Sequence, residues 1–209
     1  MTSILSLHDE HIRTDLITML QRALQFSDQG VRFVSHGGVV LVTVPITATS
    51  GLLDMGSTIL GMRAMRLGAE AQFDAVVPIA ASVEALGDGA DLEIPSAVNV
   101  PAWAAITPPR SGWQHVGDAE ADVVRAAAET TQKEVARLLP DSAGEAIIRR
   151  VRREVWADPV HAMPDLTRGA AVALDGLGFL GSDPVRVTSA GPWVRASTKL
   201  GDVLEKRGL

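Results

Sequence analysis

The sequence contains no cysteine. This absence excludes disulfides, thiolate nucleophiles, iron–sulfur clusters and the common structural zinc sites, all of which depend on cysteine sulfur. The fold must therefore be held together by packing and hydrogen bonds alone.

The sequence also lacks a long hydrophobic run. The longest nearly apolar stretch is 39–48, and Thr43, Pro45 and Thr47 interrupt it. A helix that crosses a bilayer needs about 20 apolar residues. No basic segment followed by an apolar run marks a signal peptide at the N-terminus. We therefore expect a cytoplasmic protein that has no membrane partner.

The usual catalytic and cofactor motifs are missing as well. The sequence has no G-x-G-x-x-G, no Walker-type loop, no G-x-S-x-G and no H-E-x-x-H. His8 and His11 have a spacing that can place both rings on one side of a helix, but the sequence identifies no third metal ligand. We therefore expect no catalytic residue, no metal site and no cofactor, and the balance is against an enzyme.

The composition is that of a globular protein. Apolar residues make up 46% and charged residues 21% of the 209 residues. This length predicts a single domain over residues 1–209, with a subdivision near the loop 101–117 as the alternative. The net charge of −6 disfavours a nucleic acid as partner.

Local patterns predict an α+β fold. Apolar residues at helical spacing between Ile12 and Ala23 predict a first helix, with Ser6 or Asp9 as its cap. Short β-branched runs between Gly-rich and Pro-rich turns then predict consecutive strands in the region 31–106. Pro45 should end its strand or lie at a sheet edge. The expected strands are 31–35, 39–44, 58–67, 74–79, 92–94 and 97–100.

The second half is expected to be mainly helical before a final β-hairpin. Helices are predicted at 119–139, 143–156 and 166–177, the second with a capping box of Ser142 and Glu145 and the third with Asp165 as cap. Strands at 185–189 and 193–198 flank a Gly-Pro turn. The predicted architecture is an antiparallel sheet meander with helices packed on one face and a C-terminal β-hairpin.

The loop 106–115 is the first candidate site. Pro108 and Pro109 stiffen it, and Arg110, Trp113 and His115 offer a cation, a large apolar ring and a titratable group. A rigid loop with polar tips is a common way to build a ligand site. The alternative is that Trp113 only fills a gap in the core while the prolines fix the turn.

The predicted helix 143–156 is the second candidate site. Its apolar side is expected to consist of Ile147, Ile148, Val151 and Val155. Arg149, Arg150, Arg152 and Arg153 lie opposite that side, and a basic amphipathic helix can bind phosphate, nucleic acid or an acidic partner. The alternative is a solvated face partly neutralised by nearby glutamates. Because the chain is acidic, we expect acidic groups of the same protein or of a second copy to satisfy these arginines.

Three segments of the second half resemble a set of actinobacterial proteins of unassigned function. They are 108–113 (PPRSGW), 169–181 (GAA…LGFLG) and 191–195 (GPWVR). The resemblance implies neither an activity nor a catalytic residue.

Three functions follow from these patterns. The first, which we favour, is a non-catalytic binding or scaffold protein that acts as a homodimer or another homo-oligomer. The second is a small-molecule-binding protein or enzyme with a pocket near Arg110 and His115. The third is a binder of nucleic acid or an acidic partner through the helix that carries Arg149 to Arg153.

Overall fold

A computed structural model describes residues 3–48, 56–88, 91–94, 101–140 and 142–208. Its centre is one eight-stranded antiparallel sheet in the order β5-β2-β3-β4-β12-β11-β10-β7. The N-terminal half supplies four neighbouring strands, namely β2 (Val31–His36), β3 (Val39–Thr47), β4 (Thr58–Arg66) and β5 (Phe73–Val77). The C-terminal half supplies the other four, namely β7 (Gln114–Ala119), β10 (Val185–Ala190), β11 (Trp193–Ser197) and β12 (Asp202–Lys206).

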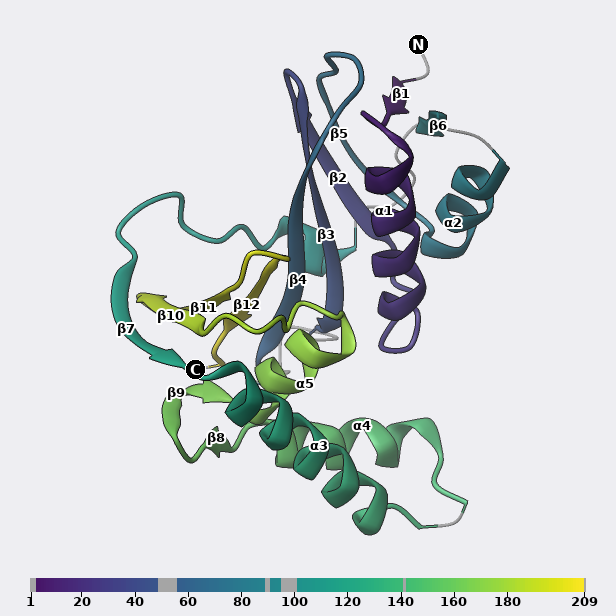
Figure 1. Cartoon of the computed structure of the whole chain (residues 1–209). Helices are drawn as coiled ribbons and strands as arrows, with labels where there is room; N and C mark the ends of the chain where they lie inside the picture. The colour runs from purple at the N-terminus through teal and green to yellow at the C-terminus, as the bar shows by residue number, and fades with distance from the viewer. Residues whose placement is uncertain (1–2, 49–55, 89–90, 95–100, 141, 209) are drawn as a thin grey trace.

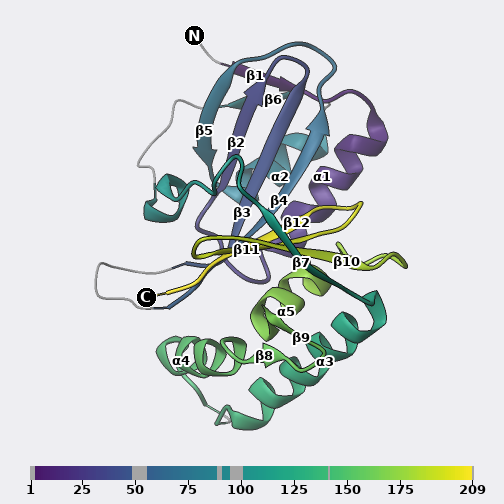
Figure 2. The ribbon, with the colours of Figure 1, turned by 90° about the vertical axis from the view of Figure 1, so that its left-hand side faces the viewer.

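Five α-helices of the described residues pack in layers over one face of this sheet (Figures 1 and 2). The helices α1 (Glu10–Ala23) and α5 (Arg168–Gly176) lie directly on the strands. The helix α2 (Ile79–Asp88) packs against α1. The helices α3 (Ala121–Leu138) and α4 (Glu145–Trp156) pack against α5 on its far side from the sheet. The predicted α+β fold with helices on one face is confirmed.

Small elements complete the fold. The strands β1 (Ser3–Ser6) and β6 (Asp91–Ile94) form a two-stranded ribbon beside α1 and α2. A second small pair, β8 (Pro159–Val160) and β9 (Met163–Thr167), leads into α5. A 3-10 turn, η1 (Ala102–Ala105), lies on the face of the sheet that carries no helix.

The two halves repeat one plan, a helix followed by a three-stranded antiparallel meander. The first meander is β2-β3-β4 after α1, and the second is β10-β11-β12 after α5. The last strands of the two meanders, β4 and β12, pair at the centre of the sheet. Gly61 of β4 lies directly beneath Leu177, where an added Cβ would collide, so this glycine permits the close approach of α5.

Most predicted elements are confirmed, including the Asp9 cap, whose carboxylate accepts a hydrogen bond from the Ile12 amide at 2.9 Å. Four details are wrong. Pro45 lies inside the interior strand β3, where the register shifts and the missing N–H is tolerated. Residues 114–117 form strand rather than loop. Gly144, not Ser142, precedes α4, without a side-chain cap, and Thr167, not Asp165, caps α5. The predicted strand 97–100 lies outside the described residues.

Candidate functional site

The loop between the two halves is fastened to the open face of the sheet. Trp103 is buried, and its indole N–H donates to the Gln29 carbonyl at 3.2 Å. The Arg32 guanidinium donates to the Ala104 carbonyl at 2.6 Å. The same guanidinium donates to both carboxylate oxygens of Asp74 at 2.8 and 2.6 Å, and these hydrogen bonds lower the pKa of Asp74. These contacts hold residues 102–105 against the open face of the sheet.

Trp113, farther along the loop, packs on the same face of the sheet as Trp103. It is half-buried against a small cluster that includes Trp103, Trp193 and Leu204, and its indole N–H donates to the Pro109 carbonyl at 2.9 Å. This arrangement matches the packing alternative for Trp113. The ring and the turn stabilise each other on the side of the sheet that the helices leave open.

The other two residues predicted for the loop site lie at the surface. Arg110 is exposed. His115 is also exposed, at the start of β7, and its Nε2 lies 3.2 Å from Oδ1 of Asp118. Among the described residues, no hydrogen bond, ion pair or cation–π contact joins Arg110, Trp113 and His115 to one another. The structure therefore does not gather them into one polar cluster.

An open hollow of about 480 Å³ lies beside this loop. Backbone and apolar groups of the loop and of the β10–β11 turn form its walls. The lining residues are Thr107, Pro109, Gly112, Ala190, Gly191, Pro192 and Trp193. Neither Arg110 nor His115 is among them. A ligand pocket needs a few convergent polar groups to orient its ligand, and among the lining side chains of this hollow only Thr107 and Trp193 carry a polar atom.

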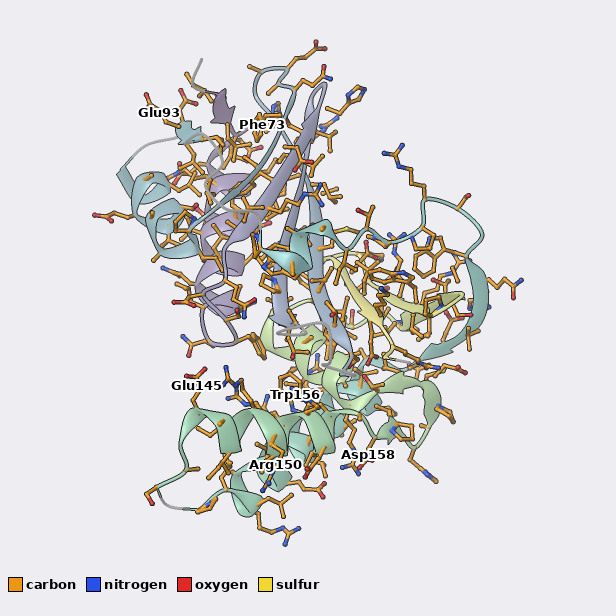
Figure 3. The ribbon with its side chains drawn as sticks, turned by 180° about the vertical axis from the view of Figure 1, so that it is seen from behind. Phe73, Glu93, Glu145, Arg150, Trp156 and Asp158 are labelled. Atoms are coloured by element: carbon orange, nitrogen blue, oxygen red, sulfur yellow. The ribbon has the colours of Figure 1, made fainter. Side chains whose placement is uncertain are left out.

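The arginines of α4 form the second candidate site. Arg149 and Arg150 are exposed, and each lies near a glutamate of the same helix, Glu145 at 3.3 Å and Glu154 at 3.9 Å. Arg152 is half-buried, and its guanidinium lies 5.9 Å from the centre of the Trp156 ring, a cation–π contact. Arg153 is exposed as well. The helix thus presents several cations at the surface (Figure 3).

The apolar side of α4 differs from the prediction at its first turn. Val151 and Val155 are buried as expected, and Trp156 is buried with them, edge-on to Phe26 at 6.3 Å between ring centres. Ile147, in contrast, is 40% exposed. An isoleucine at the surface beside arginines makes this end of α4 partly apolar as well as basic.

A buried acid that the sequence patterns did not single out lies at the start of α5. Glu205 of β12 is 2% exposed, and its carboxylate accepts a hydrogen bond from the Thr167 hydroxyl at 2.8 Å. The same hydroxyl oxygen accepts from the Ala170 amide at 3.1 Å and so caps α5. Burial raises the pKa of Glu205, while hydrogen bonds with Thr167 and Ser57 oppose that rise. The alternation of β12 is the only sequence signal that could have placed Glu205 inward.

The described residues contain neither a cluster of metal ligands nor a helix that could span a membrane. No group of three or more His, Asp or Glu side chains lies close enough together to hold a metal ion. Within the same ranges, no helix has the length and hydrophobicity needed to cross a membrane.

The N-terminal half, residues 1–105, matches the model of a protein family described as a domain of unknown function, DUF8010. The chain belongs to the DUF8010 family. Residues 108–209 match a second model, DUF8185, also described as a domain of unknown function. The two matched ranges meet just after η1. Comparison with curated protein sequences found no match.

The fold of this DUF8010 protein is similar to that of β sliding clamps. A β sliding clamp of C. crescentus matches with a TM-score of 0.53 and 11% identity, over 99% of this chain and 65% of the clamp. The DNA polymerase III subunit beta of Pseudomonas aeruginosa matches with a TM-score of 0.52 and 10% identity, over 100% of this chain and 65% of that subunit. The chain therefore spans about two thirds of the length of these structures, and the likeness concerns the fold.

Proposed function

We propose that this chain is a non-catalytic binding or scaffold protein that acts as a homo-oligomer. The observation that carries the proposal is the end-to-end likeness of its fold to sliding clamps, which extends over 99% of the chain. The matched structures are named as a clamp and as a polymerase subunit, names that describe parts of an assembly. We extend to this chain only the role of a scaffold.

The surface of the molecule supports association with partners. Ile4 on β1 and Ile147 on α4 are 50% and 40% exposed, and both stand among charged side chains. Protein interfaces combine apolar residues at their centre with polar residues at their rim.

The edges of the eight-stranded sheet give less support. The edge strand β5 is five residues long and is followed by Pro78. The edge strand β7 carries an irregularity that leaves Val116 unpaired between His115 and Gly117. Short strands, proline and bulges all discourage strand pairing between molecules. We therefore place the contact between copies on helices and ribbons rather than on these edges.

The test of this proposal is the mass of the protein in solution. Light scattering coupled to size-exclusion chromatography, over a wide range of micromolar concentrations, should give a mass above that of the 22.1 kDa chain, and the mass should rise with concentration. A mass of one chain at every concentration would overturn the homo-oligomer.

Two other functions are weaker candidates. Exposed arginines on α4 favour binding to nucleic acid or to an acidic partner. The hollow beside Trp193 favours a small molecule near the 106–115 loop, but Arg110 and His115 do not line it. Both remain proposals, and the arginine helix has the more specific chemistry.

A further inference from the structure

We propose that the exposed side of α4 docks on the outer face of the β1–β6 ribbon of a second copy of this chain. The inference rests on the proposed homo-oligomer and names the two surfaces that meet in it. Each surface combines one exposed isoleucine with exposed charges, which are net positive on α4 and negative on the ribbon.

The first surface is the outward side of α4. Ile147 and Arg150 are three residues apart and therefore share one side of the helix, and Arg149 lies beside them. Arg149 and Arg150 pair with Glu145 and Glu154, but all four side chains are at least 64% exposed. Exposed pairs within a helix contribute little to stability, so these arginines can exchange partners at small cost.

The second surface is the outer face of the ribbon. Alternation along β6 turns Leu92 inward and leaves Asp91 and Glu93 exposed. Ile4 of β1 lies directly across the ribbon from Glu93. In the part of the chain that the structure describes, neither Asp91 nor Glu93 has an ion pair. This face therefore presents an isoleucine flanked by two free carboxylates.

The distribution of charge explains why the ribbon needs cations from elsewhere. Residues 1–105 hold 11 of the 25 acidic residues but only 5 of the 19 basic ones, and none of the 5 is lysine. The whole net charge of −6 therefore lies in this half. Four of the five arginines are already engaged with groups of their own chain, namely Arg13 with Glu10, Arg22 with the Leu177 carbonyl, Arg32 with Asp74 and Arg63 with Asp15.

The two surfaces cannot meet within one chain. Glu93 and Arg150 lie at opposite ends of the molecule (Figure 3). Contact between them requires a second copy. In a closed dimer with two-fold symmetry, each copy gives its α4 to the partner and receives the partner's α4 on its own ribbon, so two equal contacts form.

Charge reversal tests this contact. The ribbon variant carries Asp91→Lys and Glu93→Lys, and the helix variant carries Arg149→Glu and Arg150→Glu. Each variant places like charges on both surfaces. Because like charges across an interface oppose association, each should raise the concentration of half-association at least about tenfold. The control Arg186→Glu with Lys199→Glu also reverses two exposed cations, away from α4, and should associate as the unaltered chain does.

Mixing the two variants distinguishes loss of the contact between copies from misfolding of either variant. The lysines of the ribbon variant face the glutamates of the helix variant, so an equimolar mixture should associate although neither variant does alone. A chain with all four reversals should associate with itself for the same reason. Circular dichroism compares the folding of each variant with that of the unaltered chain.

The outcomes distinguish this inference from the proposed function. A monomeric unaltered chain overturns both. An oligomeric chain whose association is unaffected by either pair of reversals overturns the docking of α4 on the ribbon and leaves the homo-oligomer in place. Loss of association that neither the mixture nor the fourfold reversal restores also overturns the docking.

Discussion

Leu60 of β4 lies directly opposite Leu204 of β12, and this pair joins the two halves of the sheet. Both side chains are almost fully buried, on the face of the sheet away from the helices, beside Trp103 and Trp193. The strands that carry them belong to the separately matched ranges 1–105 and 108–209. A continuous sheet across this pair leads us to propose that the two ranges fold as one domain.

Replacing Leu204 by alanine should test that proposal. The substitution removes a side chain that is 1% exposed and should lower the free energy of unfolding by about 2–5 kcal/mol. Unfolding in urea should be monitored by far-UV circular dichroism and by tryptophan fluorescence. The two signals should give one coincident transition, both in the unaltered protein and in Leu204→Ala. Leu200→Ala, at a site 38% exposed, should change stability little. Two separate transitions would indicate two independent domains.

Trp103 and Trp113 lie in the same loop region but differ in burial, so their replacements can be compared directly. Trp103→Ala removes a ring that is 2% exposed and should cost about 3–5 kcal/mol. Trp113 is only half-buried, so Trp113→Ala should cost less, about 1–2 kcal/mol. Chemical denaturation of the two variants measures the difference. Equal costs, or a larger cost for Trp113, would contradict the burial of the two rings.

Glu205 should make stability depend on pH. Because burial raises its pKa above 4.5 in the folded protein, the folded state retains a proton that the unfolded state has already lost. The unfolding free energy contributed by this group should therefore fall as pH rises from about 4.5 through the raised pKa, and stay constant above it.

Glu205→Gln provides the control for that pH dependence. Glutamine keeps an oxygen that can accept from the Thr167 hydroxyl but carries no charge. The stability of the variant relative to the unaltered protein should increase with pH over the same window. Denaturation series at several pH values measure this difference, and parallel curves for the two proteins would show that Glu205 is not the cause.

Binding of duplex DNA should be weak and sensitive to salt. The arginines of α4 already have glutamates nearby, and the chain is acidic overall. Fluorescence anisotropy should detect association at low salt only, because release of condensed counterions drives such binding. Tight binding at physiological salt that is lost in Arg149→Ala with Arg150→Ala would instead favour a nucleic-acid function.

Sequence patterns alone predicted the local elements. The first helix with Ser6 or Asp9 as its cap, the strand predicted at 58–67 and found at 58–66, and the hairpin of β10 and β11 all follow from signals within about ten neighbouring residues. Helical periodicity predicted that Ile147, Val151 and Val155 face inward on α4, and this is confirmed for the two valines but is wrong for Ile147, which is 40% exposed.

Only the tertiary structure decided how these elements combine. The pairing of β4 with β12 joins residues more than 130 positions apart, and no local pattern specifies such a partner. The same holds for Pro45, which an interior strand tolerates at a register shift, and for Thr167, which caps α5 while donating to Glu205. Local sequence determines backbone propensity and the apolar side of each element, whereas strand partners and buried polar contacts depend on which distant surfaces together exclude water.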